Sequence, residues 1–224
     1  MTDRERALKA LWRERIHLDP NALAASPRSV QSHFETAWQL VEAYLHLVAP
    51  FPAGLLNWWL CRPNGHIVIS SAPSSYRPGV QLWRGQSYVS VAFIATQDLL
   101  GSGKGAFLAS AQLLDHLFGC GAAQDQTYFS RGYGLTPDLT DMSQRYVAIE
   151  QLQYGHDELS TTSADDYLAE TLWLAVHDRQ TLNRIDPLLE KLYRQTLLTE
   201  RFWRRQILFI PGLSLPASRT PEPQ

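Results

Sequence analysis

The segment Ser87-Tyr-Val-Ser-Val-Ala-Phe-Ile-Ala95 decides the fold class, because it is rich in β-branched and aromatic residues that partly alternate with polar ones. This pattern predicts a β-strand. The glycine-rich segment Gly101-Ser-Gly-Lys-Gly105 follows it and leads into an amphipathic helix that ends near Phe118. We expect Gly119 to provide a left-handed turn at the end of this helix. A strand joined to a mostly buried helix is thus the centre of the predicted fold.

A second strand is predicted at residues 66–70, which follow the turn sequence Pro63-Asn64-Gly65. Residues 71–79 contain two prolines and a glycine and predict a loop, and residues 120–140 predict a polar loop. Residues 55–60 predict either a short helix or a strand. The apolar periodicity elsewhere predicts helices over residues 3–17, 27–48, 141–153, 164–177 and 187–198, and a short last helix to about 208. Ser26, Ser163 and Asp186 are the predicted caps of the helices 27–48, 164–177 and 187–198. Helices, a small sheet and further helices, in that order, predict an α+β fold.

The chain has 224 residues, of which 45% are apolar, and this is enough to bury a sizeable core. We predict an N-terminal helix and linker over residues 1–27 and a single domain over residues 28–208. Residues 209–224 contain three prolines after Pro211 and predict a disordered tail.

The charge balance argues against a nucleic-acid partner, because 20 basic and 22 acidic residues give a net charge of −2. One cationic cluster, Arg201, Arg204 and Arg205, is typical of a helix end that covers a hydrophobic seam. Two cysteines cannot form a disulfide framework. The longest apolar stretch, 47–60, is interrupted by prolines, and the charged N-terminus does not read as a secretory signal. We therefore expect a cytoplasmic protein with no membrane association.

Two predicted helices carry polar stripes that could face each other. Gln112, Asp115 and His116 share one stripe, and Asp166, Glu170 and His177 form the other; all six lie at helical spacings. Facing stripes of this composition could hold a metal ion. They could equally face solvent, or His116 could pair with a carboxylate as a structural link.

The order of elements and the segment Asp166-Tyr-Leu-Ala-Glu170 resemble the zincin-like peptidase domain of the anthrax toxin lethal factor family. The resemblance covers roughly residues 28–200. It implies a small, mostly antiparallel sheet whose edge strand, here Tyr88–Ala95, pairs with substrate. It also implies a following helix with a His-Glu-x-x-His motif and a later helix with the third zinc ligand.

This chain departs from the family pattern where zinc chemistry takes place. The motif reads Gln112-Leu-Leu-Asp-His116, so the first histidine ligand and the general base are replaced by Gln112 and Leu113. Asp166 stands in place of the third ligand, a glutamate in the family. The resemblance therefore implies a degenerate site without zinc or peptidase activity, and the vestigial residues are Gln112, Leu113, Asp115, His116, Asp166 and Glu170.

We accordingly predict a protein- or peptide-binding module that needs no cofactor. The residues predicted to line its groove are Tyr76, Trp83, Tyr88, Val89, Val91 and Phe93. One alternative is a metal-dependent hydrolase with His116, Asp166 and Glu170 as zinc ligands, helped by His156 and by Asp115 as base. Another is a structural or oligomer-forming protein whose seven tryptophans are core and interface anchors.

Overall fold

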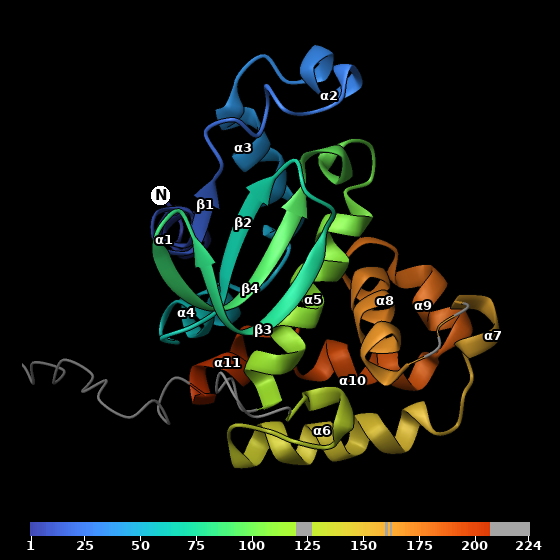
Figure 1. Cartoon of the computed structure of the whole chain (residues 1–224). Coiled ribbons are helices and arrows are strands. Elements are labelled where there is room, and N and C mark those ends of the chain that lie inside the picture. The colour runs from blue at the N-terminus through green and yellow to red at the C-terminus, as the bar shows by residue number, and fades with distance from the viewer. Residues whose placement is uncertain (120–126, 160, 162, 207–224) are drawn as a thin grey trace, which may run out of the picture.

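A four-stranded sheet in the order β1–β2–β4–β3 forms one side of the computed structural model, which describes residues 1–119, 127–159, 161 and 163–206 (Figure 1). The strands are Ile16–Leu18 (β1), His66–Ser70 (β2), Ser75–Trp83 (β3) and Gln86–Ala95 (β4). Helices precede and follow β2–β4 along the chain. The mixed α+β class predicted from the sequence is confirmed.

The pairing within the sheet differs from the prediction. β1 pairs with β2 and β2 pairs with β4 in parallel, whereas β3 and β4 are antiparallel. The expectation of a mostly antiparallel sheet is therefore wrong for the described strands. The prediction that Tyr88–Ala95 is an edge strand is also wrong, because β4 lies between β2 and β3. β3 is the edge strand on that side of the sheet.

The loop predicted over residues 71–79 is a further correction, since β3 covers part of this range. Pro78 and Gly79 lie in an irregular step between Arg77 and Val80, where the register with β4 shifts. A proline is tolerated there because an edge strand has one side without ladder partners. The turn residues that predict a loop therefore mark a bulge within a strand.

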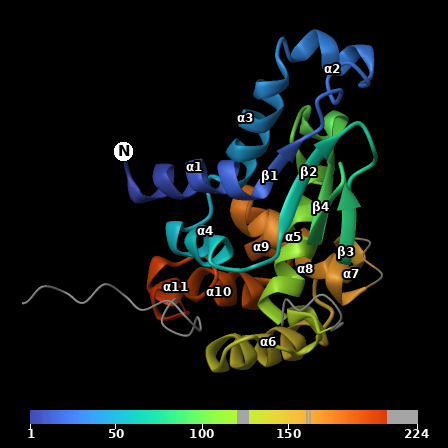
Figure 2. The same ribbon diagram turned by 60° about the vertical axis from the view of Figure 1, so that its left-hand side comes forward.

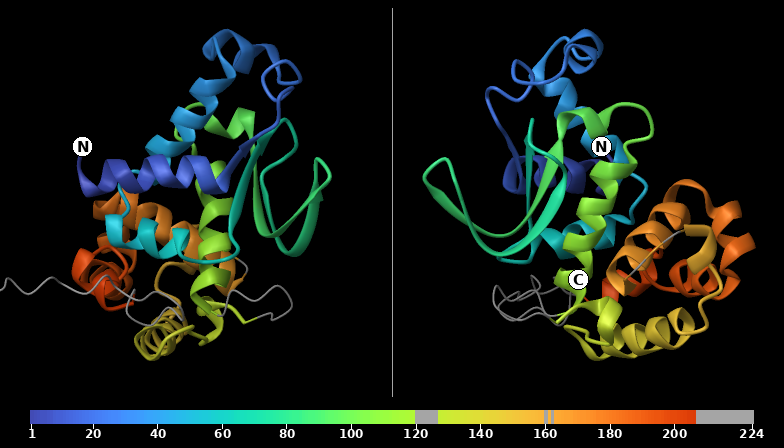
Figure 3. Two further views of the ribbon diagram at one scale, coloured as in Figure 1. Left: turned by 90° about the vertical axis from the view of Figure 1, so that its left-hand side faces the viewer. Right: turned by 45° about the vertical axis from the view of Figure 1, so that its right-hand side comes forward.

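The helices gather on one side of the sheet. Figure 2 and the left view of Figure 3 show α1, α3, α4 and α5 on this side. We call it the helix face, and the opposite side is the outer face. The helices are Asp3–Arg15 (α1), Arg28–His33 (α2), Ala37–Val48 (α3), Ala53–Leu60 (α4), Lys104–Gly119 (α5), Pro137–Glu150 (α6), His156–Leu159 (α7), Ala164–His177 (α8), Arg179–Ile185 (α9), Pro187–Gln195 (α10) and Glu200–Gln206 (α11), with short 3₁₀ turns at Thr96–Leu99 (η1) and Phe129–Arg131 (η2).

The strand register assigns side chains to the two faces. Tyr76, Ile67 and Ala92 are register partners across three strands, and Ile67 and Ala92 are fully buried in the helix-face core. Since side chains alternate along a strand, their neighbours point to the outer face. The outer-face residues of β2 and β4 are His66, Val68, Val91 and Phe93.

The predicted helix 27–48 is two helices. α2 ends at His33, and α3 starts after Thr36, whose backbone N–H donates to the Gln39 side chain at 3.2 Å. Ser26 does not cap the first helix; its hydroxyl donates to the Ala22 carbonyl at 2.5 Å. Local capping thus divides a continuous apolar pattern into two segments.

The first predicted helix also ends early, because residues 16–18 form β1 and continue the sheet beside β2. Ala7 and Leu11 of α1 belong to the same core as the sheet. Residues 1–27 therefore share a core and a sheet with the rest of the described chain, while the predicted domain boundaries stay a prediction.

The C-terminal half follows the capping signals closely. Ser163 accepts the Asp166 N–H, and Asp186 accepts the Leu189 N–H at 3.0 Å, as predicted for N-caps. α6 begins at Pro137 with Thr136 as N-cap, so the predicted loop 120–140 is too long, and α9 was not predicted. Residues 209–224, the predicted tail, lie outside the described residues.

Gly119 has a different role from the predicted one. It is the last residue of α5, and its φ does not lie in the positive region. A Cβ atom there would lie 2.3 Å from the Thr127 carbonyl oxygen. Glycine is needed for this close approach rather than for a left-handed turn.

Among the described residues, no helix has both the length and the apolar character needed to cross a membrane.

Candidate functional site

The two predicted polar stripes meet where α5 packs against α8. Gln112 Nε2 donates to Asp166 Oδ1 at 3.3 Å, and the Ser163 hydroxyl donates to Asp166 Oδ2 at 2.7 Å. A small cavity of about 190 Å³ adjoins this contact and is lined by Leu108, Gln112, Leu159, Thr161, Asp166, Ala169 and Glu170. The structure thus brings Gln112, Asp166 and Glu170 to one hollow.

His116 is directed to the sheet instead. It is fully buried, and its Nδ1 forms a hydrogen bond with the Tyr76 hydroxyl of β3. The ring of Tyr128 lies 4.9 Å from the imidazole, centroid to centroid. Burial raises the pKa of the Tyr76 hydroxyl and so favours its protonated form. His116 is therefore a packed core histidine held by β3.

The Asp115 side chain points neither to α8 nor to the sheet but towards η2. Its carboxylate accepts the Ser130 backbone N–H and the Ser130 hydroxyl, both at 2.7 Å, and the side chain is fully buried. Burial raises the pKa of Asp115 to about 7, although the two hydrogen bonds from Ser130 favour the charged form. The carboxylate serves as an anchor for the segment that follows α5.

The other predicted ligands also have partners. Glu170 forms an ion pair with Lys104 at 2.8 Å, and His156 Nε2 lies 3.2 Å from Glu150. Within residues 1–119, 127–159, 161 and 163–206 there is no group of three or more His, Cys, Asp or Glu side chains placed to hold a metal ion. The proposed ligand set of His116, Asp166 and Glu170 is thus divided among three different contacts. Leu113, at the position of the general base, is buried in the core.

The six predicted groove residues divide between the two faces of the sheet. Tyr76 points to the helix face, while Val91 and Phe93 point to the outer face, where the Arg77 guanidinium lies 4.7 Å from the Phe93 ring. Trp83 and Tyr88 lie near the tip of the β3–β4 hairpin. Val89 pairs with Val80 across the hairpin. They do not share one surface.

The open edge of β3 was not predicted. Arg84 and Gly85 form a two-residue turn in which both φ angles are positive, 50° and 78°, as in the common hairpin turns. The exposed fractions of the Val80 and Leu82 side chains beyond this edge are 63% and 75%. Arg84-Gly85 in the sequence is the signal that could have located this hairpin.

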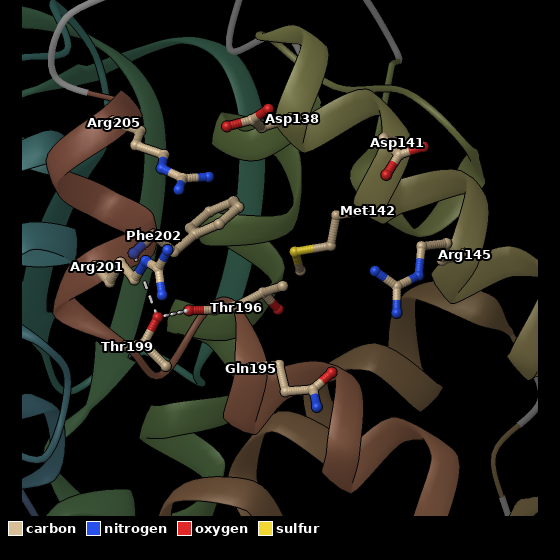
Figure 4. A pocket seen from close by; sticks show the side chains of 10 residues that line it. All are labelled: Asp138, Asp141, Met142, Arg145, Gln195, Thr196, Thr199, Arg201, Phe202 and Arg205. Carbon is tan, nitrogen blue, oxygen red and sulfur yellow. Dashed lines mark hydrogen bonds between the residues drawn. The ribbon is translucent and has the colours of Figure 1, made fainter.

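Figure 4 shows a different hollow, of about 300 Å³, between α6 and the α10–α11 segment. Arg145, Arg201 and Arg205 line it together with Asp138 and Asp141, so charges of both signs surround it. Asp138 also accepts a hydrogen bond from Gln206 Nε2 at 3.0 Å. None of the predicted site residues lines this hollow. Phe202, next to Arg201, is half-buried against the core, whereas Arg201, Arg204 and Arg205 of the predicted cluster are exposed.

No protein-family model matches this chain, and neither curated proteins nor solved structures give a match. The resemblance to the lethal factor family therefore rests on the sequence features given above.

Proposed function

We propose that this chain is a non-catalytic, zincin-like binding domain that takes up an extended segment of a protein partner by strand addition to β3. One observation carries the proposal: β3 is an edge strand with two exposed apolar side chains, Val80 and Leu82, on one face of its outer half. An unpaired strand edge is a template for an added strand.

The backbone groups of Val80 and Leu82 support this proposal. Trp83 and Gln86 flank the two-residue turn and are register partners. The residues that flank such a turn form a hydrogen-bonded pair, and hydrogen-bonded and non-hydrogen-bonded pairs alternate along an antiparallel ladder. Leu82 and Val80 therefore belong to non-hydrogen-bonded pairs, and their N–H and C=O groups point away from β4. In agreement, the carbonyl oxygen of Val89, the register partner of Val80, points away from β3 and accepts the Gly65 N–H at 3.0 Å.

The charges near this edge favour an acidic partner. Arg77 and Arg84 lie on either side of Val80 and Leu82, and neither has a carboxylate partner within the described part of the chain. Arg84 lies over the Trp83 ring at 5.6 Å. An extended peptide with apolar residues at alternate positions and acidic residues at its ends would match both features.

A displayed library of random 12-residue peptides, selected against the chain, tests the proposal. We expect alternating apolar sequences with acidic flanks to be enriched. Leu82→Pro removes an outward N–H and leaves the β4 ladder intact, so it should weaken binding of these peptides at least about tenfold.

Leu82→Thr is the matched control, because it removes the apolar side chain and keeps the N–H. It should weaken binding less than Leu82→Pro. If no peptide is enriched, or if both variants bind the selected peptides as the wild type does, the proposal is wrong. Far-ultraviolet circular dichroism and thermal melting of each variant establish that it is folded.

A further inference from the structure

A pair of histidines from two neighbouring strands lies on the outer face of the sheet. His17 of β1 and His66 of β2 approach each other, and the distance between His17 Nε2 and His66 Nδ1 is 3.1 Å. β1 and β2 are parallel, and His17 is in register with Val68, two residues after His66. The two histidines therefore project from the same face of the sheet, offset by two residues along the strands.

The tip of the β3–β4 hairpin surrounds this pair with aromatic rings. The ring centroid of Tyr88 lies 4.4 Å from that of His17 and 4.8 Å from that of His66, and the Trp83 centroid lies 5.7 Å from that of His17. The pair is half-buried by these contacts. Packing on both sides limits the rotation of the imidazole rings, so that their nitrogens are held close together.

Burial favours the neutral form of both imidazoles. Burial, helped by the positive charges of Arg15 and of a protonated His17, lowers the pKa of His66 to about 4. Burial and Arg15 also lower the pKa of His17. Neutral imidazole is the form that binds a metal.

The distance between the two nitrogens fits a shared metal ion. A zinc–nitrogen bond is about 2.0–2.1 Å long, so a tetrahedral ion holds two ligand nitrogens about 3.3 Å apart. The observed 3.1 Å is within a few tenths of an ångström of this value. A cavity of about 480 Å³ adjoins His17 and is lined by Trp83, Arg84 and Tyr88, among others. It leaves space for water beside His17.

We propose that His17 and His66 form a binding site for a divalent transition metal ion of imidazole preference, Cu²⁺ or Zn²⁺, with water as the other ligands. The ring that donates the present hydrogen bond changes its tautomer on binding, because its proton moves through solvent to its other nitrogen. No net proton is released at neutral pH. The order of affinities should be Cu²⁺ above Zn²⁺, with Mn²⁺ weaker than either. The two imidazoles belong to β1 and β2 rather than to the β3 edge proposed for peptide binding, and Arg84 lies near both sites.

Calorimetric titration of the full chain with ZnCl₂ and with CuCl₂ tests the proposal. We expect one ion per chain, and we expect His17→Gln and His66→Gln each to weaken the affinity at least about tenfold. His33→Gln and His46→Gln are matched controls, since both side chains are exposed and lie away from the pair. Neither control should change the affinity. Melting curves of the variants without metal establish that they are folded.

Two further readouts identify the site. The electron paramagnetic resonance spectrum of the Cu²⁺ form should show hyperfine coupling to two nitrogen ligands. Bound Cu²⁺ should quench Trp83 fluorescence, so Trp83→Phe should reduce the quenching and leave the affinity for Cu²⁺ unchanged. Cys61 has a free thiol, which is a competing ligand for both ions. The proposal is overturned if neither ion binds, if both histidine variants bind as the wild type does, or if Cys61→Ser abolishes binding while the histidine variants retain it.

Discussion

The helix face and the outer face of the sheet carry the same kinds of side chain in different surroundings. On the helix face, His116 and Asp115 are fully buried, and each has a hydrogen-bond partner from another element. On the outer face, His17 and His66 are half-buried, and His17 lines an open cavity. At the edge of the sheet, β3 exposes Val80 and Leu82.

This difference in burial determines which polar groups a ligand can reach. The residues that resemble a peptidase site serve packing, because Tyr76 and Ser130 occupy the hydrogen-bonding groups of His116 and Asp115. A buried polar group with such partners stabilises the fold, and access to it would require breaking those bonds. Groups open to a ligand lie on the outer face, at the histidine pair, and along the edge of β3. The same difference predicts that protonation of Asp115 and protonation of His66 change the stability of the fold in opposite directions.

The largest predicted effect concerns Asp115. Its pKa is raised to about 7 in the folded chain, above its ordinary value of 3.8, so the folded state binds more protons than the unfolded state between these values. The free energy of unfolding from this group should therefore fall as the pH rises from about 4 to 7, by at most about 4 kcal/mol. Urea denaturation of wild type and Asp115→Asn at a series of pH values measures this difference. An equal pH dependence in both proteins would contradict the account.

The second effect is the loss of the Tyr76 hydroxyl. Tyr76→Phe removes the hydrogen-bond partner of Nδ1 of the fully buried His116, so the free energy of unfolding should fall by about 1–3 kcal/mol. Tyr88→Phe is the control on the outer face, where the hydroxyl bonds to the exposed Gln86 side chain. Its expected cost is below about 0.5 kcal/mol. Equal costs for the two variants, measured by urea denaturation, would remove the distinction between the faces.

The third effect has the opposite sign to that of Asp115. The pKa of His66 is lowered from 6.5 to about 4, so the unfolded state binds more protons between these values. Stability should be lost as the pH falls through this range, by about 1 kcal/mol after allowance for screening at a half-exposed site. His66→Gln should make the stability less dependent on pH from 6.5 to 4. An unchanged dependence, measured by thermal melting, would show that the pair is not destabilised by protonation.

The last prediction concerns Ser90 of β4, where replacement by glycine has the smallest expected effect. This residue is fully buried and has a φ of +57°, which is unfavourable for a residue with a Cβ. Ser90→Gly should raise the free energy of unfolding by about 0.5–1 kcal/mol, whereas Ser90→Val should lower it by about 1–3 kcal/mol. Both are measured by urea denaturation. If valine is tolerated as well as glycine, the backbone at this bend is not strained.

The sequence predicts elements well where side chains cap them locally. Ser163 and Asp186 mark the starts of α8 and α10, and the apolar strand 66–70 is found as β2. These signals are read from neighbouring residues and do not depend on the tertiary structure. The α+β class follows from the order of such elements.

Features that depend on distant contacts could not be predicted in this way. β1 has three residues and is a strand because it pairs with β2, about 50 residues later. β3 contains Pro78 and Gly79, which are typical of a loop, and it is a strand because β4 pairs with it on either side of a bulge. The proximity of His17 and His66 follows from the pairing of β1 with β2, so spacing along the chain gives no indication of it.

The candidate site was predicted in part. The contact between Gln112 and Asp166 joins the two polar stripes that the helical spacing identifies. His116 and Asp115 belong to the same stripe in sequence, but they turn to β3 and η2 because those elements supply tyrosine and serine hydroxyls. Helical spacing gives the direction of a side chain only to within a turn, and the partner decides the rest.

Amide hydrogen exchange of β3, followed by NMR with and without a selected peptide, tests the central claim most directly. We predict that the N–H groups of Val80 and Leu82 exchange rapidly in the free chain and become protected when the peptide binds, while that of Gln81 is protected in both states. Strong protection of Val80 and Leu82 in the free chain, or peptide-induced protection confined to residues around Gln112 and Asp166, would contradict strand addition at β3.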